Sequence, residues 1–176
     1  RIFIVNTELA DPAKIKSMRD LFAPEWAGKT CMARPLTGTT LTHLTALYSV
    51  LGEEAAQAYV DEAHSLGKKG AISLTNGNAT NARLVRDGQM AFGWTDTDDY
   101  NVALEAKKPV AAVYPDQDSV GTLLIPNSIA ILEKAPHPDA ARRFVDWVLR
   151  PEIESELAHS RSAQIPVRAS VRRPGH

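Results

Sequence analysis

Over residues 30–114, short apolar segments alternate with segments of helical periodicity, and no other feature constrains the fold as strongly. The expected strands cover residues 30–34, 71–74, 90–94 and 110–114, and the expected helices cover 41–51, 53–66, 79–87 and 97–106. Strands that alternate with helices indicate an open, mostly parallel sheet with right-handed crossovers. We therefore predict an α/β fold in which helices flank the sheet.

Further elements are expected on both sides of this region. Residues 2–5 form an apolar strand, and residues 11–22 carry apolar side chains at helical spacing. Residues 122–132 are extended and apolar, and two amphipathic helices follow at 137–149 and from 151 to about 159. The remainder, rich in arginine and proline, has no periodicity, which predicts an extended or disordered tail.

Composition excludes several classes of protein. Because 20 basic residues balance 21 acidic ones, no electrostatic footprint for nucleic acid or an anionic membrane exists. No apolar run approaches the roughly 20 residues that span a bilayer. The single cysteine, Cys31, rules out an internal disulfide and is expected to pack in a strand. The chain opens at Arg1 on a strand, without an initiator methionine or a signal peptide, so we expect it to be a piece of a longer protein.

Polar residues follow two of the expected strands where a turn leads into a helix. The run Thr37-Gly38-Thr39-Thr40 offers free backbone N–H groups and hydroxyls, which suit an anion. Asn76 and Asn78 flank a glycine in the next such turn. Because the carboxyl ends of parallel strands border the ligand crevice, Thr37, Gly38, Thr39, Thr40 and Asn78 are candidate anion-binding residues. Helix capping and tight-turn geometry are the alternative roles.

A third expected strand ends in a denser polar cluster. The candidate ligand or metal residues there are Thr95, Asp96, Thr97, Asp98, Asp99 and Tyr100. The carboxylates favour a cation or an amine, whereas the Gly-Thr turn favours an anion, and both could bind together. Capping of the following helix would engage one or two of these carboxylates instead.

The chain carries several motifs whose order is informative. They are Pro35-Leu36-Thr37-Gly38-Thr39-Thr40, Asn76-Gly77-Asn78, Gly93-Trp94-Thr95-Asp96-Thr97-Asp98-Asp99, Pro115-Asp116-Gln117, Ile125-Pro126-Asn127 and Ala135-Pro136-His137-Pro138-Asp139-Ala140-Ala141. In this order they resemble the bacterial periplasmic substrate-binding proteins of ABC transporters. The resemblance covers residues 1 to about 168 and is greatest to the branch labelled ferric-iron-binding.

The resemblance implies two α/β lobes that close on a solute about a hinge. It implies an inter-lobe crossing strand at 1–8, a connecting helix and turn at 9–29, the second lobe at 30–114, a return crossing strand at 115–132, C-terminal helices that pack on the first lobe at 133–160, and an extended or disordered tail at 161–176. Most of the first lobe then lies outside this sequence. A second copy is expected to cover the apolar surface that its absence leaves.

The same resemblance implies a periplasmic, non-enzymatic component of an importer, with a membrane permease as partner and iron transport as its role. Its solute would be Fe(III) with a synergistic anion such as phosphate or carbonate, or another small anion. Thr37-Gly38-Thr39 matches the anion position and Asn78 a polar contact. Where these relatives place two adjacent tyrosines on the metal, this chain has Asp98 and Asp99, which are less selective oxygen donors, with Tyr100 one position further on.

Other functions remain open at this point. An oxyanion or organophosphonate could bind without metal. Asp96, Asp98 and Asp99 could instead hold Mg²⁺ in a phosphoryl-transfer or hydrolytic enzyme, although the chain has no Walker lysine and no nucleophile elbow. The effector-binding domain of a regulator shares the two-lobed architecture.

Single residues outside these motifs receive ordinary structural roles. His43 and His64 lie within helical patterns without metal-ligand spacing, so surface or capping roles are expected. Trp26 and Trp147 are expected to pack. Trp94 lies near the predicted crevice.

Overall fold

The structure is a computed structural model, and it describes residues 1–172 of the chain. It divides into two compact units, Arg1–Ile125 and a second that begins at Pro126. No helix within residues 1–172 combines the length and the apolar character that crossing a membrane requires.

The first unit is built on a five-stranded sheet. Its strands are β1 (Ile2–Asn6), β2 (Thr30–Ala33), β3 (Ser73–Thr75), β4 (Phe92–Thr95) and β5 (Val110–Val113), in the order β3-β2-β4-β1-β5. Strand β2 pairs in parallel with β3 and β4, whereas β1 pairs antiparallel with β4 and β5. Four strands therefore run in one direction and β1 runs against them. The predicted open, mostly parallel α/β sheet is confirmed.

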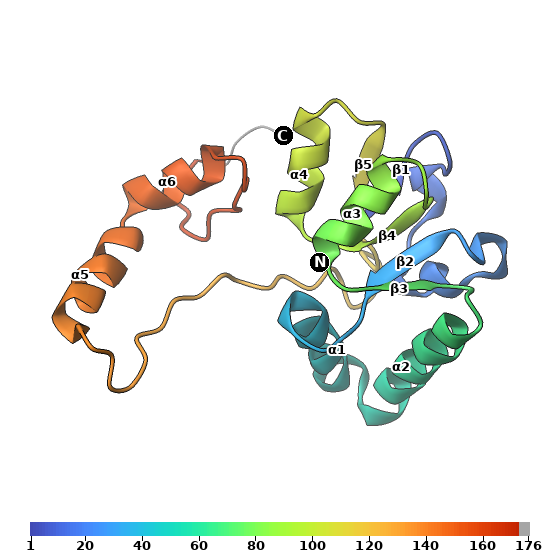
Figure 1. Cartoon of the computed structure of the whole chain (residues 1–176), viewed down its shortest axis with the longest axis horizontal. Helices are drawn as coiled ribbons and strands as arrows, with labels where there is room; N and C mark the ends of the chain where they lie inside the picture. The colour runs from blue at the N-terminus through green and yellow to red at the C-terminus, as the bar shows by residue number, and fades with distance from the viewer. Residues whose placement is uncertain (173–176) are drawn as a thin grey trace. The chain divides into compact units, whose positions relative to one another are not determined.

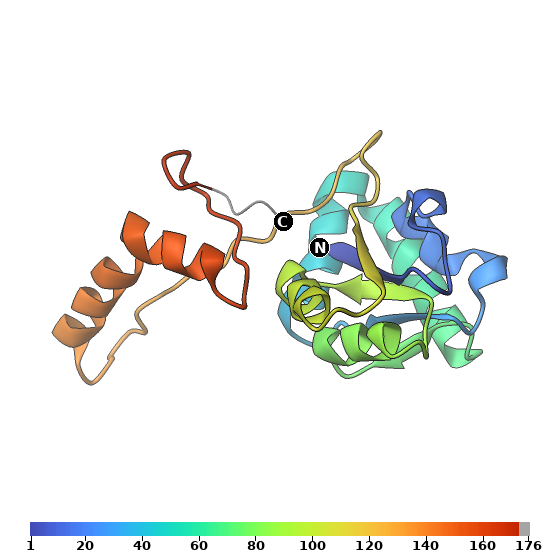
Figure 2. The same ribbon diagram turned by 90° about the horizontal axis from the view of Figure 1, so that it is seen from above.

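Helices cover both faces of this sheet. They are α1 (Gly38–Leu51), α2 (Glu53–Lys68), α3 (Asn78–Arg86) and α4 (Thr97–Glu105). Helices α1 and α2 lie on one side of the sheet and α3 and α4 on the other (Figure 1 and Figure 2). Side chains of a strand alternate between faces, so Phe3 and Val5 join the apolar cluster with α1 and α2, whereas Ile4 joins the smaller one with α3 and α4.

Gly93 of β4 pairs with Cys31 of β2 in the sheet. A Cβ atom on Gly93 would lie 2.4 Å from Cys31 Sγ and 2.5 Å from the carbonyl oxygen of Cys31. Only glycine fits this position in the sheet. Cys31 is buried in a strand, as predicted, and burial raises the pKa of its thiol to about 12.

The helix predicted at 11–22 is wrong. Two short 3-10 helices take its place, η1 (Pro12–Lys14) and η2 (Met18–Phe22), and a third, η3 (Pro24–Trp26), follows. Asp11 accepts a hydrogen bond from the backbone of Ala13, and Ser17 forms a capping box at the start of η2. These local side-chain bonds compete with a continuous helix and divide the segment into single turns.

The return crossing strand predicted at 115–132 is not formed, because no strand follows β5 in the described chain. Asp116 anchors the start of this segment, since its carboxylate accepts hydrogen bonds from Ser17 Oγ at 2.8 Å and Met18 N at 2.9 Å. The backbone nitrogen of Arg1 donates to the carbonyl oxygen of Leu123 at 2.6 Å. Asp116 and Leu123 are thus tied to the rest of the first unit by side-chain and single backbone bonds rather than by a ladder.

The second unit contains both helices that the sequence predicts, α5 (Pro138–Val148) and α6 (Pro151–His159). Helix α5 buries none of its residues, and Phe144 and Trp147 remain 56% and 46% exposed. The expected packing role of Trp147 is therefore not met within the described residues. Packing of these helices on a first lobe, and pairing with a second copy, stay predictions.

Residues 161–172 of the tail form no helix or strand, and one part of them contacts α6. The Glu154 carboxylate of α6 accepts hydrogen bonds from the backbone of Val167 at 2.6 Å and from Arg168 Nη1 at 2.6 Å. These hydrogen bonds hold this part of the tail to α6, and its extended character stays a prediction. Residues 173–176, which the tail prediction also covered, lie outside the described residues.

Candidate functional site

Three helices begin at one edge of the sheet. Helices α1, α3 and α4 follow β2, β3 and β4 through short turns, and their N-cap residues are Thr37, Gly77 and Asp96. Within residues 1–172, neither Thr37 nor Asp96 accepts a side-chain hydrogen bond from the first turn of its helix, and Gly77 has no side chain to do so. Free N–H groups and the positive ends of three helix dipoles therefore face the same region, which favours an anion.

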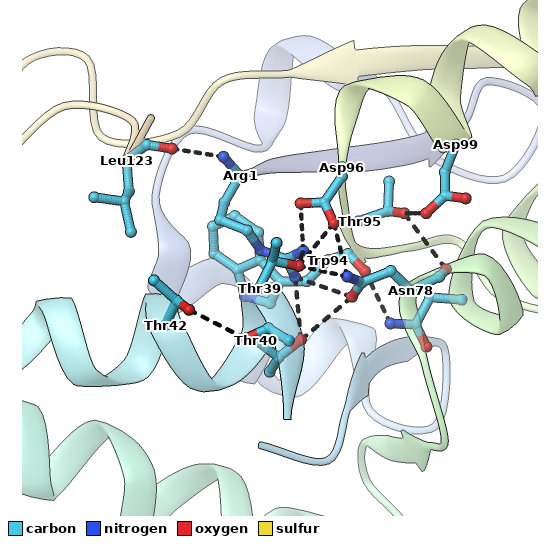
Figure 3. Close-up of polar contacts among 12 residues, drawn as sticks. Arg1, Thr39, Thr40, Thr42, Asn78, Trp94, Thr95, Asp96, Asp99 and Leu123 are labelled. Carbon is cyan, nitrogen blue, oxygen red and sulfur yellow. Dashed lines mark hydrogen bonds and ion pairs between the residues drawn. The ribbon is translucent and has the colours of Figure 1, made fainter. Parts of the chain in front are cut away.

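A polar network joins these three helix starts (Figure 3). Thr39 Oγ1 donates to Asp96 Oδ2 at 2.7 Å. Asn78 Nδ2 donates to the same carboxylate oxygen at 2.8 Å and to Thr39 Oγ1 at 2.7 Å. The structure thus brings together one residue from each of the three turns in which the sequence predicts a site.

Arg1 lies at the centre of this network, and sequence reasoning missed it. Its Nη1 atom donates to Asp96 Oδ1 at 2.6 Å and to Thr39 Oγ1 at 3.0 Å, and Nη2 donates to Asn78 Oδ1 at 3.2 Å (Figure 3). Arg1 is only 6% exposed, its guanidinium lies 5.9 Å from the centre of the Trp94 ring, and its buried Nε has no hydrogen-bond partner in the described chain.

A signal for Arg1 was present in the sequence. It is the one charged residue at the start of an otherwise apolar strand. Because β1 runs antiparallel to β4, with Ile2 opposite Thr95, the start of β1 lies where β4 ends. The direction of β1 in the sheet, which apolar periodicity does not report, brings Arg1 to the site.

The three carboxylates form a close group, with one oxygen from each of Asp96, Asp98 and Asp99 within 4.8 Å of the others. Both oxygens of Asp96 already accept hydrogen bonds from the network. Asp99 accepts one from Thr95 Oγ1 at 2.8 Å, and burial raises the pKa of its carboxyl group despite this bond. Asp98 makes no hydrogen bond to the residues that the structure describes. The open acceptor positions therefore belong to Asp98 and Asp99.

The remaining predicted residues occupy different surroundings. Thr37 and Gly38 are exposed at the first turn of α1, where Gly38 has a φ of +65°. Thr40 is buried and its hydroxyl lies 3.3 Å from Asn78 Oδ1. Thr97 lies in the first turn of α4. Tyr100 is half-buried and packs against the apolar cluster beneath α3 and α4, and its role as a ligand stays a prediction.

The surface or capping role expected for His43 is also wrong. His43 is 4% exposed, and its ring meets the Trp94 ring edge to face with centres 4.7 Å apart. Burial, reinforced by the charge of Arg1, lowers the pKa of His43 to about 3, so the imidazole is neutral at pH 7. Trp94 is buried beside it and donates from Nε1 to the hydroxyl of Tyr59 at 3.2 Å.

Comparison with known proteins adds to this geometry. Residues 1–175 match the family described as bacterial extracellular solute-binding protein. A curated relative, the spermidine/putrescine-binding periplasmic protein of Escherichia coli (strain K12), is 26% identical over 160 residues, which are 89% of this chain and 44% of that protein.

Two solved structures share the fold. The ferric binding protein from Campylobacter jejuni superposes with a TM-score of 0.83 at 24% identity over 99% of this chain and 57% of that one. The periplasmic binding protein AfuA from Actinobacillus pleuropneumoniae, solved with fructose-6-phosphate, gives 0.78 at 24% identity over 99% and 54%. The chain spans about half the length of these relatives.

Proposed function

The chain belongs to the bacterial extracellular solute-binding proteins, and from that premise we propose that it serves as part of the solute-binding component of an ABC importer in the periplasm, with a membrane permease as its partner. The family is one of binding proteins, which agrees with the prediction that the chain is not an enzyme. The solute that we propose is a small molecule bearing an oxyanion, such as a phosphate or a phosphonate.

The observation that carries this proposal is the convergence of three uncapped helix starts on one polar network. Backbone N–H groups at the start of α1, α3 and α4 lack side-chain caps. An oxyanion with several acceptor oxygens can accept from more than one of these N–H groups at once. The carboxylate of Asp96 behind the network is neutralised by its ion pair with Arg1, so it does not repel the same guest.

The network also argues against a metal ion on Asp96. A cation there would displace Arg1 from a carboxylate only 2.6 Å away and would face the guanidinium charge. Fe(III) with an anion is the second candidate, since Asp98 and Asp99 retain open oxygens and a ferric binding protein has this fold. These two carboxylates could equally accept hydrogen bonds from an amine or hydroxyl group of the solute.

The variant Thr37→Asp tests the proposal. Aspartate is a favoured N-cap residue, so it should cap the first turn of α1 and raise the free energy of unfolding by up to about 1 kcal/mol. Its carboxylate would occupy the N–H groups that we assign to the oxyanion and would repel the anion. Thr45→Asp, at an exposed position further along α1, adds the same charge without reaching the first turn.

Isothermal titration calorimetry with phosphate, sulfate, bicarbonate and methylphosphonate provides the measurement. We expect at least one anion to bind the unaltered chain and Thr45→Asp, and to bind Thr37→Asp about tenfold more weakly or worse. Equal affinity in all three proteins would overturn the assignment of the helix start. A parallel titration with Fe(III) citrate tests the second candidate, Fe(III) with an anion. That candidate requires binding that depends on iron and that Asp98→Asn abolishes.

A further inference from the structure

A cavity of about 310 Å³ lies in the first unit beside the polar network. One wall is the side of α1 that carries His43, Leu47 and Val50, and the opposite wall comes from residues 115–124. Trp94 and Arg1 complete the lining near the network. The volume falls in the usual range of small-molecule sites, and apolar cavities about half as large hold benzene.

His43 gives this cavity a polar feature that its packing does not explain. The imidazole is buried, lines the cavity and forms no hydrogen bond with any residue in the described range. A neutral imidazole carries one donor and one acceptor, and the ring nitrogens of His43 are not among the fully buried, unpartnered side-chain atoms of the described residues, so they keep access to open space. A molecule in the cavity would meet a hydrogen-bonding partner whose ring is already held in place by Trp94.

The cavity adjoins the helix start to which the proposed function assigns the oxyanion. Thr39 and His43 are four residues apart on α1, which places them on the same side of the helix about one turn apart. Arg1 links the two regions, because its guanidinium belongs to the network and the residue also lines the cavity. A single small solute can therefore reach both.

We propose that the solute is an organic oxyanion of two parts, whose anionic group binds at the helix starts while a largely apolar body enters this cavity and forms a hydrogen bond with His43. The inference rests on the proposed function, since it extends the same site to a second compartment. It assigns the substrate class as a phosphate or phosphonate ester or acid with a small cyclic or branched body, and it excludes a bare inorganic anion as the preferred solute.

Calorimetric titration with methylphosphonate and phenylphosphonate tests the apolar compartment. Phenylphosphonate should bind about tenfold tighter or more, because its ring leaves water for the cavity. The variant Ala46→Phe fills the cavity from α1 and should abolish this advantage while leaving the affinity for methylphosphonate unchanged. Ala58→Phe, which makes the same change at an exposed position on α2, is the matched control and should keep the advantage.

A second pair of probes tests His43. Adding a hydroxyl to the phenyl ring of phenylphosphonate, at its third or fourth carbon, should increase affinity about fivefold or more for at least one isomer. His43→Phe retains an aromatic ring beside Trp94 and removes both hydrogen-bonding nitrogens. This variant should cancel the gain in affinity from the hydroxyl and preserve the gain in affinity from the phenyl ring.

The outcomes separate the two proposals. If methylphosphonate binds and the phenyl ring adds nothing, or if Ala46→Phe weakens both ligands equally, the cavity proposal is overturned and the oxyanion site stands. If none of the phosphonates and none of the inorganic anions binds, the proposed function fails and the cavity proposal fails with it. Thermal unfolding establishes that each variant folds, and Val50→Trp fills the same cavity if Ala46→Phe does not fold.

Discussion

The guanidinium of Arg1 lies 2.6 Å from Oδ1 of Asp96, and this ion pair joins the start of β1 to the N-cap of α4. The side chain of Arg1 is 1% exposed and that of Asp96 is 29% exposed. Because the pair neutralises Asp96, this carboxylate does not repel an anionic group from the positive helix ends, whereas Asp98 and Asp99 keep open oxygens nearby. The pair also fixes the two elements relative to each other at the edge where the site is formed.

Breaking this pair should destabilise the first unit. Removing one partner of a buried ion pair costs about 3–5 kcal/mol, and partial exposure of Asp96 reduces this to about 1–3 kcal/mol for Arg1→Gln or Asp96→Asn. The double variant should lose less than the sum, with a coupling of about 1–2 kcal/mol. Urea unfolding of the unaltered chain, the two single variants and the double variant measures this coupling. The exposed pair Arg19 and Glu62 is the control, with a coupling below about 1 kcal/mol. Additive losses at Arg1 and Asp96 would contradict the pairing.

His43 should make the protein sensitive to mild acid. Its folded-state pKa, lowered to about 3, lies below the ordinary value of 6.5, so the unfolded chain takes up a proton first as the pH falls. The stability tied to neutral His43 is complete above about pH 6.5 and is lost towards pH 3, at about 1.4 kcal/mol per pH unit. The charged groups that act on His43 are the guanidinium and the amino group of Arg1, which lower its pKa, and the carboxylate of Asp96, which raises it.

Urea unfolding between pH 7 and pH 4 tests this dependence. His43→Phe should show a shallower loss of stability than the unaltered chain, so that the difference between them grows as the pH falls. His64→Gln, at an exposed position on α2, is the control and should follow the unaltered chain. Parallel pH profiles for His43→Phe and the unaltered chain would show that His43 is not buried as described.

Gly93→Ala should destabilise the sheet by about 1–3 kcal/mol or more, because the new Cβ would overlap Cys31 in the neighbouring strand. Part of the overlap is with the carbonyl oxygen of Cys31, so the additional change Cys31→Ala should not restore stability. Gly77→Ala is the control, since a Cβ there meets no atom within 4 Å, and it should cost at most about 1 kcal/mol. Rescue of Gly93→Ala by Cys31→Ala would place the overlap at the sulfur alone.

Glu154→Gln should release the tail from α6. The hydrogen bond from Arg168 is the main cause that lowers the pKa of Glu154, and the same carboxylate also receives two backbone N–H groups. Trypsin should therefore cleave after Arg168 several-fold faster in this variant. Glu156→Gln, at an exposed position on the same helix, should leave the rate unchanged. Equal cleavage rates in all proteins would show that Glu154 does not hold the tail.

The amino-acid sequence by itself determined the α/β class, the order of strands and helices over 30–114, and the three turns that contribute to the site. These follow from local rules, since apolar periodicity reports which face of an element is buried and Gly-Thr or Asp-Thr runs mark helix starts. The sequence predicted three residues of the site because each lies in such a turn, namely Thr39, Asn78 and Asp96.

Only the tertiary structure decided the position of Arg1 and the burial of His43. The antiparallel insertion of β1 between β4 and β5 brings Arg1 to the site, and strand direction leaves no mark in apolar periodicity. His43 lies on the buried face of α1 with Thr40, Leu44 and Leu47, and it also contacts Trp94 and lines a cavity with a loop that begins more than seventy positions later. Contacts between distant segments set the charge, burial and open volume of the site, because each depends on which side chains meet in space and not on their neighbours in the chain.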